Sequence, residues 1–218
     1  KHNNVKITNF VTTGVWKDPG KTGLIMEDGK IDGQNVVEDA VRWSDYTCRR
    51  VEITRTIDGF KGHGNVLIED CWIHDLFFST GAGTGAGGFS HNDGLQVSSG
   101  NNVVIKHTRI ENTRGNSAVF VDADQGTISG VTIADNYFNN SGNYMVYVKQ
   151  SASAPQFGLP SNITITGNVF GKRPEYLDPT WGLMAAEVHA NNLVWSNNIQ
   201  ESSGKQLVLD SWGKANPA

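Results

Sequence analysis

The chain has 218 residues, which suits one domain with a substantial core or one elongated stack of repeats. Its formal net charge of −4 argues against a general nucleic-acid-binding protein, because such a protein needs a basic surface. Only 18% of the residues are charged, whereas glycine and asparagine are frequent, and both tolerate the backbone angles of tight turns. The composition therefore predicts a β-rich protein, and no apolar run approaches the ~18 residues that a membrane span needs.

A motif of alternating apolar residues, a short turn and a further apolar residue recurs along the chain. Less regular copies occupy residues 4–10 and 50–57, and five clear copies occupy 65–73, 102–110, 130–138, 162–170 and 192–199. The clear copies begin 28 to 37 residues apart, which fits the coils of a parallel β-helix and is short of the ~40–45 residues of a propeller blade. Amphipathic helices, which a doubly wound fold would need between its strands, are not evident. The step from the copy at 50–57 to the next one is too short for an ordinary coil.

One turn position of this motif is shared by all five clear copies. The residues at that position are Cys71, Thr108, Asn136, Asn168 and Asn198. An inward asparagine at the same point of successive coils predicts a stacked ladder, in which each amide bonds the next and satisfies buried backbone groups. The chain has two cysteines, Cys48 and Cys71, too few for a disulfide scaffold, and the sequence leaves open whether they are bonded.

Each coil contains a second apolar alternation, which predicts a second strand. The segments are 23–27, 41–44, 59–61, 94–98, 118–122, 145–149, 184–189 and 206–210. Their inward residues align as Leu95/Val97, Val119/Val121, Val146/Val148, Ala186/Val188 and Leu207/Leu209. One outward column then holds Arg42, Gln96, Phe120, Tyr147, Glu187 and Val208, the other holds Ser44, Ser98, Asp122, Lys149, His189 and Asp210, and Lys61 belongs to one of the two.

Acidic, basic, imidazole and phenol side chains gather in these two outward columns. Neighbours in one column lie about 4.8 Å apart, and outward residues two apart on a strand lie about 6.5–7 Å apart. Asp122, Lys149 and His189 are therefore expected on three successive coils, beside Tyr147. This mixture indicates a functional site. The alternative is a solvent-facing surface on which Asp122 and Lys149 form a cross-strand ion pair.

Three segments without strand periodicity interrupt the single predicted domain, at about 77–93, 150–161 and 171–182. The first is rich in glycine and ends near His91, and the third carries Tyr176 and Trp181. Loops of this length in a compact coil are usually functional or disordered. They could wall a groove for a chain-like ligand, with aromatic rings stacked on sugar faces, or they could be linkers between strands.

The segments "SHNDGLQV" (90–97), "IENT" (110–113) and "ADNYF" (134–138) resemble those of secreted bacterial right-handed β-helix proteins that act on polysaccharides. Within that group, the small size and the strand with Tyr147 and Lys149 look most like the compact alginate lyases of polysaccharide lyase family 31. The resemblance runs from Asn3 to about Trp212, although pectate lyases and other uronan lyases share the architecture. It implies an all-β, single-domain right-handed parallel β-helix (a solenoid) over residues 1–218.

The same resemblance implies an extracellular lyase that cleaves an acidic polysaccharide, most nearly alginate, by β-elimination. The reaction must neutralise the uronate carboxylate, remove the C5 proton and protonate the departing O4. Either Lys149 is the base and Tyr147 the acid, or Tyr147 or His189 handles the protons while Lys149 neutralises charge. The residues expected to bind substrate are Gln96, Asp122, His91, Lys61, Arg42 and Glu187.

Residues 91–93 and Asp122 could contribute ligands to Ca²⁺, but the sequence lacks the dense cluster of acidic residues that a calcium site needs, so we expect no essential metal or other cofactor. We expect a monomer that binds neither nucleic acid nor a membrane. Two other functions remain open. Glu187 and Asp210, about 8 Å apart on adjacent coils, would suit an inverting glycoside hydrolase. The third possibility is a non-catalytic carbohydrate-binding or structural β-helix.

Overall fold

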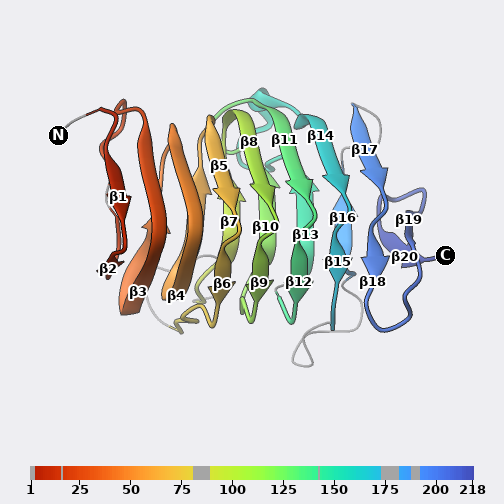
Figure 1. Cartoon of the computed structure of the whole chain (residues 1–218). Coiled ribbons are helices and arrows are strands. Elements are labelled where there is room, and N and C mark those ends of the chain that lie inside the picture. The colour runs from red at the N-terminus through yellow and green to blue at the C-terminus, as the bar shows by residue number, and fades with distance from the viewer. Residues whose placement is uncertain (1–2, 16, 81–88, 142, 173–181, 188–191) are drawn as a thin grey trace.

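The computed structural model describes residues 3–15, 17–80, 89–141, 143–172, 182–187 and 192–218. Within these ranges the protein is all-β, and its helical content is the short 3-10 helix η1 (Pro155–Phe157). An 18-stranded sheet contains nearly all the strands, which succeed one another from the N-terminal to the C-terminal end of the molecule (Figure 1). Among the described segments, no helix has the length and apolar character that crossing a membrane would require.

The strands of this sheet form three columns, in which each strand pairs in parallel with its counterparts one coil before and one coil after. The first column contains β1 (Lys6–Thr8), β5 (Val66–Glu69), β8 (Gly100–Lys106), β11 (Ile128–Ala134), β14 (Ser161–Thr166) and β17 (Leu193–Ser196). The second contains β2 (Val11–Thr12), β6 (Trp72–His74), β9 (Arg109–Glu111), β12 (Tyr137–Asn139), β15 (Val169–Phe170) and β18 (Ile199–Gln200). The third contains β7 (Asp93–Val97), β10 (Ser117–Asp122), β13 (Tyr144–Lys149) and β16 (Met184–Ala186).

Two long strands near the N-terminus, β3 (Leu24–Val41) and β4 (Tyr46–Gly62), run through all three columns. β4 pairs in turn with β5, β6 and β7, so one continuous strand contributes to each column. The all-parallel pairing in three recurring columns is consistent with a parallel β-helix.

The core is built from inward residues that repeat at the same place in each coil. Ile68, Ile105, Ile133 and Ile165 are register partners in the first column, and all four are fully buried. Burial of one such side chain stabilises the fold by about 1.5–3 kcal/mol. Because each isoleucine packs on the one above it, the apolar alternation of the motif fixes which face of every strand points inward.

The predicted polar ladder is confirmed. Asn136, Asn168 and Asn198 are buried, and the side-chain oxygen of each accepts the backbone N–H of the residue one coil earlier, at 2.9 to 3.0 Å. Their amide groups also donate to the backbone carbonyls of Ile105, Ile133 and Ile165. The ladder therefore satisfies backbone groups at a corner that would otherwise be buried without partners.

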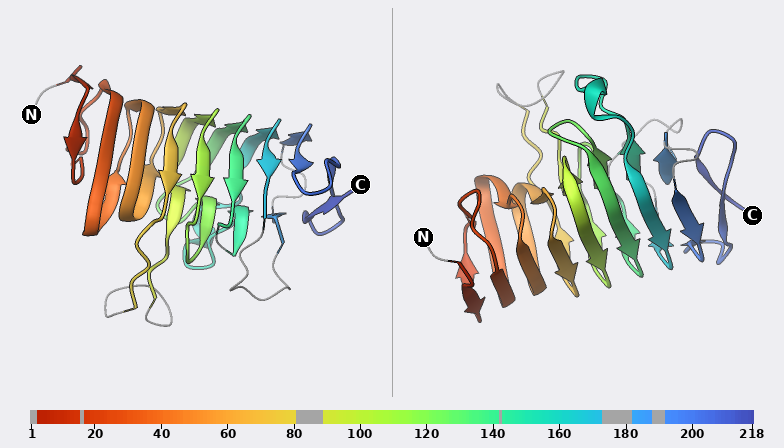
Figure 2. Two further views of the ribbon diagram at one scale, coloured as in Figure 1. Left: turned by 60° about the horizontal axis from the view of Figure 1, so that its bottom comes forward. Right: turned by 90° about the horizontal axis from the view of Figure 1, so that it is seen from above.

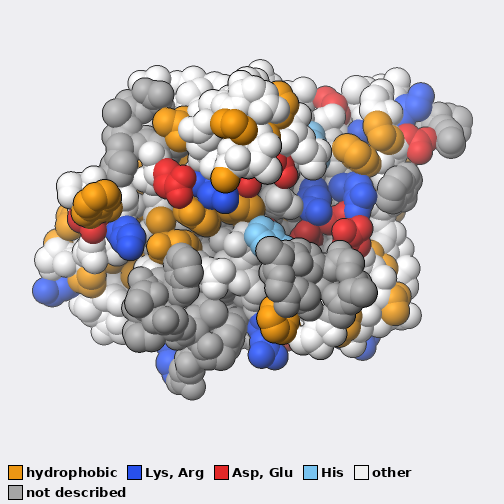
Figure 3. All heavy atoms as spheres, turned by 180° about the vertical axis from the view of Figure 1, so that it is seen from behind, with side chains coloured by type: hydrophobic (Ala, Val, Ile, Leu, Met, Phe, Trp, Pro, Cys, Tyr) orange, Lys and Arg blue, Asp and Glu red, His pale blue; other side chains and the backbone are white. Residues whose placement is uncertain are grey.

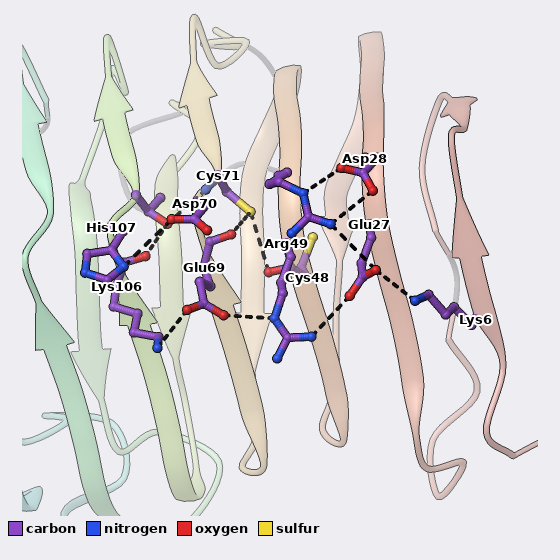
Figure 4. Close-up of polar contacts among 12 residues, drawn as sticks. Lys6, Glu27, Asp28, Cys48, Arg49, Glu69, Asp70, Cys71, Lys106 and His107 are labelled. Atoms are coloured by element: carbon purple, nitrogen blue, oxygen red, sulfur yellow. Dashed lines mark hydrogen bonds and ion pairs between the residues drawn. The ribbon is translucent and has the colours of Figure 1, made fainter.

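A ladder of alternating charge runs along the outer side of the first column (Figure 4). Glu27, Arg49, Glu69 and Lys106 follow one another in register, and Lys6 bonds Glu27 at 2.9 Å. Arg49 contacts both neighbouring glutamates, and Lys106 lies 2.7 Å from Glu69. Lys106 and Arg49 lower the pKa of Glu69 to about 2. In-register stacking thus places opposite charges directly above one another, a favourable cross-strand arrangement.

The register of the early coils differs from the sequence prediction. Tyr46 and Cys48 pair with Val66 and Ile68, so the repeat copy lies at 45–53 and the copy predicted at 50–57 was wrong. The segment 23–27 was predicted as a second strand, but its residues 24–27 pair with 46–49 and belong to the first column. The physical reason is the corner at Arg50, where φ is +53° and the strand alternation restarts. The same correction removes the step that was too short for a coil.

The last predicted coil is also wrong. β19 (Leu207–Leu209) pairs antiparallel with β20 (Ala215–Pro217) and does not join the third column. Asp210 lies in the connecting turn, where its Oδ1 accepts the backbone N–H groups of Trp212 and Lys214 at 2.8 and 2.9 Å. The turn closes the hairpin, and so Leu207 and Leu209 have no strand to stack on in the predicted register.

Both cysteines are buried free thiols. The Cys71 thiol lies at the head of the polar ladder and donates to the Cys48 carbonyl at 3.6 Å. Burial raises the pKa of Cys48 well above its ordinary value, so this thiol is held in its neutral form.

Candidate functional site

The third column carries the predicted site. Its strands lie on the side facing away from the viewer in Figure 1, and Figure 3 shows that side, with basic, acidic and histidine side chains in a band across the middle. The segments that flank residues 81–88 project away from the body, joined by a bridge between Thr80 and Phe89, and the segment with η1 projects on the same side (Figure 2). The third column and the projecting segments therefore lie on one side of the molecule.

The order of the outward residues is confirmed over four coils. Lys61, Gln96, Phe120 and Tyr147 are register partners on β4, β7, β10 and β13. Arg42 directly follows Val41, the partner of Phe60, and therefore lies next to Lys61 in the same column. Lys61, Gln96 and Tyr147 are half-buried and Phe120 is buried, so the phenylalanine ring forms the floor between polar neighbours.

Tyr147 and Lys149 lie on the same side of β13. Both are half-buried, and the Lys149 Nζ atom lies 5.7 Å from the centre of the Tyr147 ring. The same Nζ atom lies 5.6 Å from the centre of the Phe120 ring, whose centre is 5.6 Å from that of Tyr147. The ammonium therefore shares an aromatic surface with the phenol, an arrangement that a cation–π contact favours.

The Tyr147 hydroxyl donates a hydrogen bond of 2.8 Å to Glu187 Oε1. Burial of the ring, and then the negative charge of Glu187, raise the pKa of Tyr147 above its ordinary value. Both causes disfavour the phenolate. Tyr147 is therefore a protonated hydrogen-bond donor at neutral pH.

The predicted position of Glu187 is wrong by two residues along the strand. Tyr147 pairs with Ala185 and Val148 with Ala186, and the backbone N–H of Glu187 donates to the Val148 carbonyl. Glu187 therefore follows β16 beside Lys149, and does not occupy the column of Tyr147. The apolar alternation has a period of two, so a shift of two residues preserves the inward pattern and the sequence could not distinguish the registers. His189, the third predicted catalytic residue, lies outside the described residues.

Asp122 and Lys149 are register partners, as predicted. Within the part of the chain that the structure describes, however, no carboxylate lies within ion-pair distance of Lys149, so the alternative of a simple cross-strand ion pair is not supported. Asp122 is largely buried, and burial raises its pKa although Lys149 opposes the shift. Its Oδ1 atom is buried and has no regular hydrogen bond within the described ranges.

His91 lies at the edge of this aromatic surface. Its ring meets the Phe120 ring edge to face, with centres 5.3 Å apart. Its Nδ1 atom lies 3.2 Å from Oδ2 of the buried Asp93. Burial of the imidazole favours its neutral form, but Asp93 outweighs that effect and raises the pKa of His91.

Lys61 and Arg42 are the remaining predicted cations, and both contact buried carboxylates. Lys61 Nζ lies 3.1 Å from Asp39 Oδ1 and 3.2 Å from Asp58 Oδ2. Arg42 contacts Asp39 and lies 3.2 Å from Glu38. Arg42 also lines a cavity of about 450 Å³ between the first two coils. A larger cavity of about 590 Å³ opens elsewhere, near Trp72, and none of the predicted site residues lines it.

Three aspartates, Asp39, Asp58 and Asp93, form this cluster. The sequence interpretation missed the first two and considered Asp93 only as part of a disfavoured calcium site. A signal was present, because each begins an Asp–small–apolar triplet: "DAV" (39–41), "DGF" (58–60) and "DGL" (93–95). The small residue is required by close packing between coils, since a Cβ on Gly94 would lie 2.6 Å from the Ala118 carbonyl oxygen. An aspartate followed by a small residue is typical of turns, so the sequence pattern does not indicate that these triplets lie in the third column.

Among the described residues, no group of three or more histidine, cysteine or acidic side chains is arranged to hold a metal ion. The arrangement instead offers a protonated phenol, an ammonium and an imidazole around one aromatic ring. These groups can donate or accept protons and can bind an anionic ligand.

In comparisons with known proteins, no protein-family model, no curated protein and no solved structure matches the chain.

Proposed function

We propose that the protein is a polysaccharide lyase that cleaves an acidic 4-linked uronan, most nearly alginate, by β-elimination on a right-handed parallel β-helix. One observation carries the proposal: Tyr147 and Lys149 project from the same side of β13, with their functional groups over a shared aromatic surface. A proton donor and a cationic or basic amine are the groups that this reaction needs beside one sugar ring.

Tyr147 is suited to protonate the departing O4 oxygen. Its raised pKa keeps the proton on the phenol until an alkoxide-like oxygen develops next to it. The hydroxyl donates to Glu187 in the free protein, so the incoming sugar must replace that acceptor. Because Glu187 is exposed, its carboxylate can turn to water when it loses the tyrosine.

Lys149 serves either as the base at C5 or as the cation that neutralises the carboxylate. No described carboxylate lies within ion-pair distance of its ammonium, and this supports both assignments equally. As base, Lys149 would first have to be neutral; as cation, it would stabilise the enolate-like intermediate directly. A comparison of alanine and arginine at this position separates the two.

The surroundings of this pair suit a polyanionic chain. Lys61 and Arg42 lie in the same outward column as Tyr147, and Gln96 stands between them and the Phe120 ring. Both cations contact buried carboxylates but are partly exposed, so they would bind successive uronate carboxylates, and the half-buried Tyr147 ring would pack on a sugar face. Action on such a polymer places the protein outside the cell.

Two rival functions lose or lack support. The inverting hydrolase relied on Glu187 and Asp210, and Asp210 lies instead in the C-terminal hairpin turn. A non-catalytic carbohydrate-binding β-helix fits the same column of cations. Binding alone, however, does not require the protonated Tyr147 beside Lys149.

The test is to incubate the purified protein with mannuronate-rich alginate, guluronate-rich alginate and polygalacturonate. A lyase creates an unsaturated uronyl end, so absorbance near the ultraviolet edge should rise on at least one polymer. New reducing ends without that absorbance would indicate a hydrolase. Retention of the polymer without any new ends would indicate a binding protein.

A further inference from the structure

Three buried aspartates stack on successive coils beneath the predicted site. Asp39 and Asp58 are register partners on β3 and β4, and the backbone N–H of Asp93, at the start of β7, donates to Asp58 Oδ1 at 2.8 Å. Asp39 is 7% exposed, Asp58 3% and Asp93 0%. Carboxylates buried this closely cannot all be ionised unless positive charge compensates them.

Two permanent cations face this stack, and His91 stands beside its third member. Lys61 contacts Asp39 and Asp58, and Arg42 contacts Asp39. The group that contacts Asp93 and can carry a positive charge is His91.

The other charged groups around this cluster act in both directions. Lys149 disfavours a charged His91, whereas Asp58 and Asp122 favour it, and Glu38 contacts Arg42. Burial and the neighbouring Asp93 raise the pKa of Asp58 to about 7. Asp58 therefore keeps a proton toward neutral pH, and burial also raises the pKa of Asp93, against the opposing effect of His91. The ion pair at the exposed edge of the cluster is that of Asp93 with the half-exposed His91.

Asp93 is rigidly held. Asn116 donates to Asp93 Oδ1 at 2.8 Å, while Oδ2 is buried, has no regular hydrogen bond to any residue that the structure describes, and faces His91 Nδ1 at 3.2 Å. A carboxylate fixed in this way sets the orientation of an imidazole and favours a proton on Nδ1. The ring is thereby fixed against Phe120, next to Tyr147.

We propose that Asp93 is a positioning residue that holds His91 as an imidazolium, whose second N–H binds the uronate carboxylate of the substrate. This inference rests on the proposed function, because it assigns the neutralising group of the same reaction. It leaves Lys149 free to remove the C5 proton and Tyr147 to protonate O4. A fixed imidazolium adjacent to the carboxylate stabilises the negative charge that develops after C5 is deprotonated.

The first experiment follows the imidazole resonances by NMR as pH is varied, with His91→Gln used to assign the His91 signal. We expect the pKa of His91 to exceed the ordinary ~6.5 in the wild-type protein. Asp93→Asn should lower it by about one unit or more, because it removes the adjacent opposite charge. Asp70→Asn is the matched control, since Asp70 lies 3.8 Å from His107 on another column and its loss should leave His91 unchanged.

A wild-type pKa of His91 below its ordinary value, or one that Asp93→Asn leaves unmoved, would overturn the inference. The wild-type measurement decides this point even if the Asp93 variant does not fold. Neither result depends on turnover, so the pairing is tested even if the proposed function fails.

The second experiment tests what the imidazolium binds. A saturated uronate tetramer should shift the His91 resonances, and its affinity should fall as pH rises through the pKa of His91. In a protein that cleaves uronan, the high-pH fall of kcat/KM should move to lower pH in Asp93→Asn by the same amount as the NMR value. A tetramer that leaves His91 unperturbed, or a pH profile unmoved while the NMR value shifts, would refute the assignment. Absence of any turnover combined with a perturbed His91 would refute the lyase proposal and leave a uronate-binding site.

Discussion

The hydroxyl of Tyr147 and the carboxylate of Glu187 are joined by a hydrogen bond of 2.8 Å that connects β13 to the residue after β16. The donor is half-buried and the acceptor is exposed. Such a bond contributes little to stability, because the carboxylate is well solvated when the bond is absent. It does hold the phenol protonated and oriented, which is the state in which the proposed acid must meet its substrate.

Replacement of Tyr147 by phenylalanine should abolish most of the proposed turnover. Loss of a positioned proton donor typically lowers the rate about 10²- to 10⁴-fold. The free energy of unfolding should change by no more than about 1 kcal/mol, because only a bond to an exposed group is lost. The ultraviolet absorbance assay and urea denaturation measure the two quantities.

Tyr137→Phe is the matched control for this variant. The Tyr137 hydroxyl also donates to a glutamate, Glu201 at 2.9 Å, but it belongs to β12 in the second column. It should cost a similar small amount of stability and leave turnover unchanged. Wild-type turnover in Tyr147→Phe, or equal losses in the two variants, would exclude Tyr147 as the acid.

Two replacements of Lys149 distinguish its possible roles. Alanine removes both the base and the charge and should reduce kcat/KM at least ~100-fold under either assignment. Arginine keeps the charge but cannot give up its proton, so it should be as inactive as alanine if Lys149 is the base. Partial activity with arginine would make Lys149 the neutralising cation and would leave the proton transfers to other groups.

Lys106→Ala provides the comparison for a lysine that is engaged elsewhere. Lys106 pairs with Glu69 on the outer side of the first column, whereas Lys149 belongs to the third column. Its loss should weaken the charge ladder slightly and leave kcat/KM as in the wild type. If uronan cleavage fell equally in Lys106→Ala and Lys149→Ala, the loss would reflect the net charge of the protein and not the proposed site.

The central part of the third column could be predicted because two local rules agree there. Strand alternation decides which residues point outward, and stacking of like apolar residues decides which coils align, so Gln96, Phe120 and Tyr147 fall in one column. The polar ladder was predictable for the same reason, since Asn136 and Asn168 sit at one motif position.

The flanks could not be predicted, because a pattern of period two does not distinguish shifts of two residues. Glu187 was therefore predicted beside Tyr147, two residues before Lys149, which it aligns with in the structure. At the C-terminus, Leu207 and Leu209 keep the alternation of a coil although Gly213, with φ of +70°, turns the chain back into a hairpin. The buried aspartates could not be predicted, because an aspartate followed by glycine, as at Asp58, is typical of a turn.

Replacement of Asn168 by alanine should strongly destabilise the fold. Its side chain is fully buried, accepts the backbone N–H of Asn136 at 2.9 Å and donates to the Ile133 carbonyl at 2.9 Å. At least two buried backbone groups lose their partners, at about 1–3 kcal/mol each, so we expect a loss of about 3 kcal/mol or more. The exposed Asn101 is the control, and alanine there should change the free energy of unfolding by less than about 0.5 kcal/mol. Similar values for the two variants would contradict a structural role for the ladder.

The pH dependence of stability should reveal the buried aspartates. Burial and Asp93 raise the pKa of Asp58 to about 7, above its ordinary value of 3.8. Between these two values the folded protein keeps the proton and the unfolded chain releases it, so the contribution of Asp58 to stability falls as pH rises from about 4 to about 7. Asp58→Asn removes this contribution. The difference in unfolding free energy, variant minus wild type, should therefore increase with pH across that window and level off above it.

Asp210→Asn should show the opposite sign. The backbone N–H groups of Lys214 and Trp212 lower the pKa of Asp210, so its contribution is present above the ordinary pKa and is lost as pH falls. This variant should be less stable than the wild type at neutral pH and should approach it in acid. Urea denaturation at pH values from 3 to 8 measures both differences. A gap between Asp58→Asn and the wild type that stays constant from pH 4 to 7 would mean that Asp58 is ionised in the folded protein throughout, and that burial and Asp93 do not raise its pKa.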